Sequence, residues 1–232
     1  MYPERSVPYS SIEVQSRFLN RVYAYMAGGL ALTAFVAFFT ASSPAMLQVI
    51  LGNKLVFYGL MLGQLGLVVW MSGLVGNMSA ATASTVFLIY SALNGLTLSV
   101  IFLVYTGTSI ASVFVISAGM FGAMSLWGFA TKRDLTGLGS FAFMGLIGIV
   151  LASLVNIFLK SDAVSFVISI IGVIVFVGLT AYDTQKLKQM AATVDADSEA
   201  GRRGAISGAL ALYLDFINLF LMLLRLFGGR RD

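Results

Sequence analysis

Two aspartates stand out in this sequence because they lie within long apolar segments that carry almost no other charge. Asp215 lies near the middle of LYLDFINLFLMLL, and Asp183 lies at the end of the apolar run in VGLTAYDTQKL. An aspartate at the centre of a membrane-spanning helix costs about 3 kcal/mol on insertion scales, so such residues generally face the protein interior and serve a function. Both aspartates are therefore candidates for a functional site.

The chemistry available to a pair of buried aspartates is proton exchange and cation binding. Two carboxyl groups in a poorly hydrated site cannot easily both be ionised, so they would share a proton and titrate as a unit. When ionised, Asp183 and Asp215 are hard oxygen ligands suited to transient binding of Ca²⁺. Asn218 lies about one helical turn from Asp215 and could add an oxygen along an ion path.

A structural interpretation is also open for each aspartate. Asp183 could be an interfacial residue paired with Lys186 or Lys188, and Asp215 could be a neutral acid that is hydrogen-bonded for packing. If both lie on adjacent antiparallel helices, the 1.5 Å rise per residue places them at depths that differ by about 8 Å. Contact between the two carboxyl groups is allowed but not required.

The composition identifies the class of protein that must position these residues. The chain has 232 residues, of which 59% are hydrophobic and 10% are charged, whereas soluble domains are about 25% charged. This excludes a water-soluble globule and a disordered chain. The absence of cysteine excludes disulfides and iron–sulfur clusters, and the absence of histidine excludes an HExxH zinc site. The net charge of +4 is expected from cytoplasmic Lys and Arg rather than from nucleic-acid binding.

Seven apolar segments are long enough to span a membrane as helices. They cover residues 22–42, 55–74, 80–105, 110–130, 141–159, 164–183 and 205–227. The sequence predicts an all-α integral membrane protein with a flexible N-terminal tail over residues 1–20 and a single seven-helix domain over 21–232. The longest connection is expected over residues 184–204, because it carries most of the charge outside the tails.

Small and polar residues are expected to organise the packing of these helices. In the last segment, one stripe of the helical wheel is small and polar. It contains Gly204, Gly208, Ala211, Asp215, Asn218 and Met222. The stripe predicts a central helix whose polar seam lines a path. The GxxxG pairs Gly59/Gly63 and Gly204/Gly208 are expected to pack helices closely within the protein, and Gln64, Asn94 and Asn156 are expected to hydrogen-bond between helices.

The distribution of basic residues predicts the orientation in the membrane. With seven spans, nine Lys and Arg residues fall on the side of the N-terminus and five on the opposite side. Because cytoplasmic loops are enriched in these residues, a cytoplasmic N-terminus and an external C-terminus are expected.

Three stretches of the sequence resemble the Bax inhibitor family, in particular its bacterial branch. They are AYDTQKL around Asp183, LYLDFINLFLMLLRLFG around Asp215 and GMFGAMSLWGFATKRDLTGLG in the middle of the chain. The resemblance covers nearly everything after Arg17. It implies a seven-helix fold in which the C-terminal helix is enclosed by the other six, located in the bacterial inner membrane.

The resemblance also implies a function. Family members are described as pH-sensitive calcium-leak proteins whose two aspartates, at the positions of Asp183 and Asp215, act as a proton-controlled latch. Ca²⁺ would pass along the last helix as the transported ion, and no cofactor is expected. In some calcium-leak members an arginine at the inner end of the second helix partners the first aspartate. Residues 70–82 of this chain contain no basic residue, so either another cation substitutes or the latch responds to a different pH.

Other functions are also compatible with the sequence. Some bacterial relatives are partners of a membrane-bound protease, so the alternative is a non-conducting regulator that binds such a protease or another membrane protein. An intramembrane aspartyl protease would also use two aspartates, but the sequence at Asp215 is YLD rather than GxGD, and the chain is not expected to be an enzyme. A retinal receptor is excluded because the last segment contains no lysine for a Schiff base.

Overall fold

The computed structural model describes residues 11–231, apart from the side chains of residues 11–14, 74 and 75. Seven of the helices in this part of the chain are long and apolar enough to cross a membrane. They are α1 (Ser11–Ala41), α3 (Lys54–Leu74), α4 (Ala80–Leu98), α6 (Gly107–Ala130), α7 (Thr136–Leu159), α8 (Asp162–Ala191) and α9 (Glu199–Phe227). The described residues contain no named strand, which confirms the predicted all-α membrane fold.

Three short elements complete the described part of the chain. Helix α2 (Pro44–Leu51) connects α1 to α3, and the 3₁₀-helix η1 (Val75–Asn77) lies between α3 and α4. Helix α5 (Ile101–Val104) continues the third span, which begins with α4, to the end of its apolar segment.

Five of the helices begin where the sequence places a capping hydroxyl group. Ser43, Ser79, Thr106, Ser161 and Ser198 each accept a hydrogen bond from a backbone N–H three residues further on. Such a cap satisfies one of the free backbone donors in the first turn of a helix. These caps set the starts of α2, α4, α6, α8 and α9.

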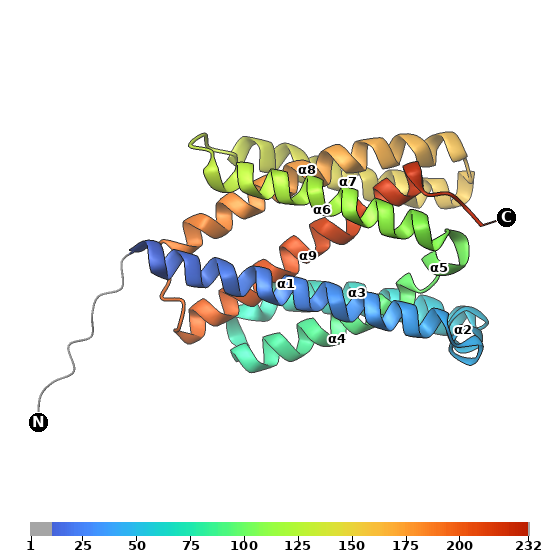
Figure 1. The fold of residues 1–232 in the computed structure, drawn as a ribbon, viewed down its shortest axis with the longest axis horizontal. Coiled ribbons are helices and arrows are strands. Elements are labelled where there is room, and N and C mark those ends of the chain that lie inside the picture. Colours follow the sequence, from blue (N-terminus) through green and yellow to red (C-terminus); the bar gives the residue numbers. More distant parts are fainter. Residues whose placement is uncertain (1–10, 232) are drawn as a thin grey trace, which may run out of the picture.

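Helix α9 passes between two groups of helices (Figure 1). One group contains α6, α7 and α8, and the other contains α1, α3 and α4, as the helix contacts also indicate. Helix α9 is the most buried of the seven spans and has extensive contacts with α1, α4, α6 and α8. This position agrees with the prediction that the last helix is central. Its enclosure by all six other spans stays a prediction.

Two predicted boundaries were wrong because helices α8 and α9 extend beyond their apolar segments. The connection expected over residues 184–204 is a loop only between Ala191 and Glu199. At 1.5 Å per residue, the 30 residues of α8 span about 45 Å, which exceeds the roughly 30 Å hydrocarbon core of a bilayer. Similarly, residues 11–20 of the expected flexible tail belong to α1, and residues 1–10 lie outside the described part of the chain.

Glycines determine how closely several of the helices approach one another. Gly128 of α6 faces the backbone of Ala181 of α8, so a methyl group at this position would overlap the main chain. Gly208 of α9 faces Leu187 of α8 in a similar way, which confirms the predicted intramolecular packing at this GxxxG pair. At the other predicted pair, Gly59 and Gly63, a methyl group would meet nothing within 4 Å, so the prediction of close packing was wrong there.

The contact between α6 and α8 generates a stability prediction. The variant Gly128→Ala should lower the free energy of unfolding by roughly 1–3 kcal/mol, because backbone cannot move aside as a side chain can. Thermal melting of the purified protein in detergent measures this change. Gly122→Ala is the matched control on the same helix, because a methyl group at Gly122 has open space. Equal melting temperatures for the two variants would contradict the packing described here.

Candidate functional site

A buried tyrosine fixes the rotation of α9 about its own axis. Tyr213 is fully buried, and its hydroxyl group is hydrogen-bonded to Thr33 Oγ1 of α1 at 2.6 Å and to Asn94 Nδ2 of α4 at 3.0 Å. Its ring packs edge-on against Phe87 and Tyr90 of α4, with centroids 5.7 and 5.8 Å away. Because Tyr213 binds α1 and α4, Asp215 two residues later lies on another face of α9.

Contacts between α8 and α9 set the register of the two aspartates. A methyl group on Gly204 would lie 3.2 Å from Met190 Sδ, and one on Gly172 would lie 2.8 Å from Met222 Cγ. These two contacts, near the two ends of α9, are consistent with a single antiparallel register of α9 against α8. In this register, Ala211 lies level with Asp183, and Asp215 lies about one helical turn, or 6 Å, further along. The short side chain of Ala211 leaves space beside the carboxyl group of Asp183.

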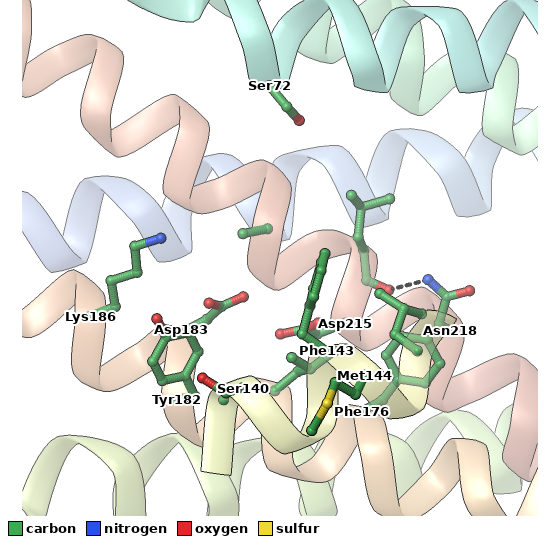
Figure 2. A pocket seen from close by; sticks show the side chains of 15 residues that line it. Ser72, Ser140, Phe143, Met144, Phe176, Tyr182, Asp183, Lys186, Asp215 and Asn218 are labelled. Carbon is green, nitrogen blue, oxygen red and sulfur yellow. Dashed lines mark hydrogen bonds between the residues drawn. The ribbon is translucent and has the colours of Figure 1, made fainter. Parts of the chain in front are cut away.

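The structure brings the two predicted site residues together. Asp215 is buried, with 4% of its surface exposed, and Asp183 is half-buried. Figure 2 shows both carboxyl groups directed into the same opening, where they interact directly with one another. The Oδ2 atom of Asp215 has no hydrogen-bond partner among the described residues. A buried carboxyl oxygen without a partner is costly, so packing alone does not account for Asp215.

The aspartates line a cavity of about 790 Å³ between α3, α7, α8 and α9. Its polar side chains come from all four helices; Ser140 on α7 and Tyr182 on α8 lie beside Asp183 in Figure 2, and Ser72 on α3 lies across the opening. Lys186, one turn along α8, also lines the cavity and interacts electrostatically with Asp183. On α3, residues 70–74 contribute no cation to this cavity, and Lys186 is its positively charged group among the described residues.

Of the two lysines that could pair with Asp183, Lys188 is directed to another group. Lys188 donates a hydrogen bond to the carbonyl oxygen of Phe129 at 2.6 Å, and its ammonium group lies 5.0 Å from the ring of the same residue. Within residues 11–231, the ion pairs with a distance below 4 Å join Arg17 and Arg21 to Asp197 in the loop before α9. Asp183 therefore shares its cavity with both Asp215 and Lys186, and forms no ion pair below 4 Å with either lysine.

The open face of α9 differs from the predicted stripe. Gly204, Gly208 and Met222 pack against α8 and line no path. Between residues 211 and 225, the partly or fully exposed positions of α9 instead recur every three or four residues on the adjacent face. They are Ala211, Leu214, Asn218, Leu221 and Arg225. The wheel missed Leu214 and Leu221 because they are apolar, although their spacing from Asn218 places them on its face.

Asn218, the third predicted site residue, connects two cavities. With Leu214 it lines both the cavity of the aspartates and a second cavity of about 600 Å³ between α3, α4, α5 and α9. Its amide group donates a hydrogen bond to the carbonyl oxygen of Leu214 at 2.8 Å. The second cavity in turn shares Met61, Tyr105 and Arg225 with a third cavity at the other end of the bundle. Three adjoining cavities thus follow the open face of α9.

The loop between α6 and α7 is fixed near the aspartates by Gln185. The side chain of Gln185 accepts a hydrogen bond from the backbone N–H of Leu135 at 2.9 Å and donates one to the carbonyl oxygen of Arg133 at 2.8 Å. In the same loop, hydrogen bonds from the hydroxyl and backbone N–H of Thr136 hold the pKa of Asp134 below its ordinary value. Asp134 is therefore ionised at neutral pH and stays so on mild acidification.

The donor set fits a cation in passage better than a resident metal ion. No group of three or more acidic, histidine or cysteine side chains occurs in the described part of the chain. Two carboxyl groups and one amide are fewer than the six to eight oxygen ligands of a stable calcium site.

A helical bundle with seven candidate spans and two aspartates in one internal cavity defines a polytopic membrane protein. The family model described as inhibitor of apoptosis-promoting Bax1 matches residues 15–232. The chain belongs to the Bax inhibitor family.

Bacterial relatives match over almost their entire length. The chain is 56% identical to the inner membrane protein YbhL of Escherichia coli K12 over 230 residues, which cover 97% of this chain and 98% of the relative. It is 46% identical to a protein of Borreliella burgdorferi, with 95% of each chain covered. It is 40% identical to a membrane protein of Streptococcus pyogenes, with 94% of each chain covered.

Access of water to the cavity can be tested with introduced cysteines, because the chain has none of its own. In Ala211→Cys the new thiol should react rapidly with a water-soluble thiol reagent, because Ala211 lines the cavity. In Leu212→Cys, the matched control, the thiol should react much more slowly because Leu212 is fully buried. Reaction rates are measured by mass spectrometry of the folded protein. Similar rates at the two positions would show that the cavity does not admit water.

Proposed function

We propose that this protein is a pH-sensitive leak for Ca²⁺ or related cations in the bacterial inner membrane, gated by the proton-sharing pair Asp183 and Asp215. The observation that carries the proposal is that both carboxyl groups are directed into one cavity, where one of them is almost fully buried. The inner-membrane location follows that of the relative YbhL. The proposal assigns no catalytic step to the pair.

Protonation would control the pair through its charge. With one shared proton, the two carboxyl groups can hydrogen-bond to each other across the α8–α9 contact. With no proton, the carboxylates repel one another and attract a cation. The two protonation states therefore favour different separations of the groups and different occupancies by a cation, which is what a proton-controlled latch requires.

The route proposed for the ion follows the open face of α9. From the aspartates, the cation would pass Leu214 and Asn218 into the second cavity, because these two residues line both spaces. Asn218 would supply an amide oxygen at this boundary. Since the seven spans place nine basic residues at the end of the bundle that holds the N-terminal part of α1, that end is proposed to be cytoplasmic.

Replacing either aspartate by asparagine should abolish the pH response of ion flux, because a neutral amide cannot gain or lose the proton. Uptake of Ca²⁺ into proteoliposomes is measured between about pH 6 and 8, the range in which physiological pH switches operate. The parent should show a pH-dependent flux, whereas Asp183→Asn and Asp215→Asn should show a flux that is nearly independent of pH.

The matched control for these variants is Asp134→Asn. Asp134 is fully exposed outside the spanning helices and remains ionised over this pH range, so its replacement should leave the pH profile unchanged. A parental pH profile in both Asp183→Asn and Asp215→Asn would contradict the latch. Folded protein with no flux above that of empty vesicles would refute the leak and favour the non-conducting regulator that binds a membrane-bound protease.

Lys186 is proposed to be the cation that tunes the pair, in place of an arginine on α3. An ammonium group beside a carboxyl group favours its ionised form, so Lys186→Gln should move the midpoint of the pH response to higher pH. The shift should shrink at high salt because Lys186 is exposed. The midpoint comes from the same flux assay. Lys188→Gln is the control, because the Lys188 ammonium group is bound to Phe129; equal midpoints in the two variants would exclude Lys186 from the latch.

A further inference from the structure

The third cavity lies at the end of the bundle remote from the aspartates. It has a volume of about 770 Å³ and is lined by residues of α3, α7, α8, the α5–α6 connection and the C-terminal part of the chain. Two arginines line it, Arg225 in the last turn of α9 and Arg230 beyond its end. Asp183, Asp215 and Lys186 do not line this cavity, so it is distinct from the site of the acid pair.

The backbone after α9 is fixed in the position that brings Arg230 to the cavity. Thr106 donates a backbone hydrogen bond to Gly229 at 3.0 Å, and Arg231 donates one to Val104 at 2.9 Å. Gly229 also donates a hydrogen bond to the hydroxyl group of Ser109 at 3.0 Å. These bonds form an antiparallel bridge between Tyr105 and Arg230. The location of Arg230 is therefore a built feature of the fold.

Neither arginine is neutralised by a residue in the part of the chain that the structure describes. The side chains of Arg225 and Arg230 make no hydrogen bond or ion pair with any residue of the part described by the structure. The acidic group that lines the same cavity is Asp162, in the first turn of α8, and it forms no ion pair below 4 Å with either arginine. The two guanidinium groups thus leave the cavity with a net positive charge and ten free N–H donors.

Three neutral polar residues of the cavity already form hydrogen bonds within α8 or between α7 and the start of α8. Asn156 donates hydrogen bonds to Ser161 O and Ser165 Oγ, and Ser169 donates one to Ser165 O. Recognition of a ligand in this cavity therefore depends on the arginines. Guanidinium groups match the geometry of a phosphate group, which can accept two parallel hydrogen bonds from one arginine.

The apolar part of the cavity lining faces the membrane. Ile157 and Phe166 are 65% and 57% exposed, on α7 and α8, and Met61 of α3 is 44% exposed. In a bilayer, such surfaces of spanning helices contact acyl chains. Arg225 and Arg230 lie at the helix ends, where the phosphate groups of lipids are located. The cavity thus combines cationic groups at headgroup level with an apolar surface beside them.

We infer that this cavity binds a membrane phospholipid, with Arg225 and Arg230 holding its phosphate group and the apolar side chains contacting its acyl chains. Basic pockets between spanning helices bind lipid headgroups by this chemistry. Because Arg225 also lines the second cavity, the bound phosphate lies beside the outer end of the route along α9 and offsets the positive charge there.

The test measures thermal melting of the purified protein in detergent while short-chain phosphatidylglycerol is added. The lipid should raise the melting temperature of the parent by a few degrees, because it binds the folded state. Arg225→Gln and Arg230→Gln should weaken the apparent affinity by about tenfold or more, the effect expected for losing a charged hydrogen-bonded contact. Arg231→Gln is the matched control, because Arg231 is adjacent in the chain but does not line the cavity.

Inorganic phosphate distinguishes the lipid from a free anion. At the same concentration it should not reproduce the shift, because it has no acyl chains. A phosphate shift of equal size that depends on both arginines would overturn the lipid as occupant, and an unchanged response to phosphatidylglycerol in both variants would overturn the site. Native mass spectrometry provides a readout independent of melting: the parent and Arg231→Gln should retain a phosphatidylglycerol adduct that Arg225→Gln and Arg230→Gln lose.

Discussion

The structure depends on one constraint, which is that polar groups in an apolar bundle must find their partners within the protein. The hydroxyl group of Tyr213 meets this requirement through Thr33 and Asn94, and Gln64 does so through the carbonyl oxygen of Leu93 at 3.0 Å. Asp215 does not meet it fully, because its Oδ2 atom is buried without a partner. Among the described residues, two buried side-chain atoms lack a partner, Thr40 Oγ1 of α1 and Asp215 Oδ2. The charged group of these two lies at the candidate site and lines the same cavity as Asp183.

The sequence predicted the spans and the acid pair because both depend on the cost of charge in an apolar segment. It also predicted that Gln64 and Asn94 would join helices, which the hydrogen bonds from α3 to α4 and from α4 to α9 confirm. The contact between Asp183 and Asp215 was left open, because it requires the register of α8 against α9. That register follows from contacts between α8 and α9 at Gly172, Gly204 and Gly208. A helical wheel of one helix carries no information on contacts with another helix.

The predictions that failed concerned the faces and ends of helices. A wheel weighted by polarity favoured the small residues of α9, whereas in the structure those residues bring α8 close and the open face includes Leu214 and Leu221. Helices α8 and α9 extend beyond their apolar segments because capping and tertiary contacts, rather than hydropathy, determine their ends. Ser198 caps α9 at a position that hydropathy assigned to a loop, and Asp197 beside it pairs with Arg17 and Arg21.

Attachment at both ends limits how α9 can respond to a change at its centre. At one end Arg203 donates hydrogen bonds to the carbonyl oxygens of Gly76 and Met78, and at the other the segment after α9 is bonded to residues 104–109. A helix restrained in this way cannot slide along its axis without breaking one attachment. Repulsion between Asp183 and Asp215 would instead be relieved by twisting α9 or by outward displacement of its neighbours. Helix α3, the least buried of the seven spans, is the wall of the cavity that costs least to displace.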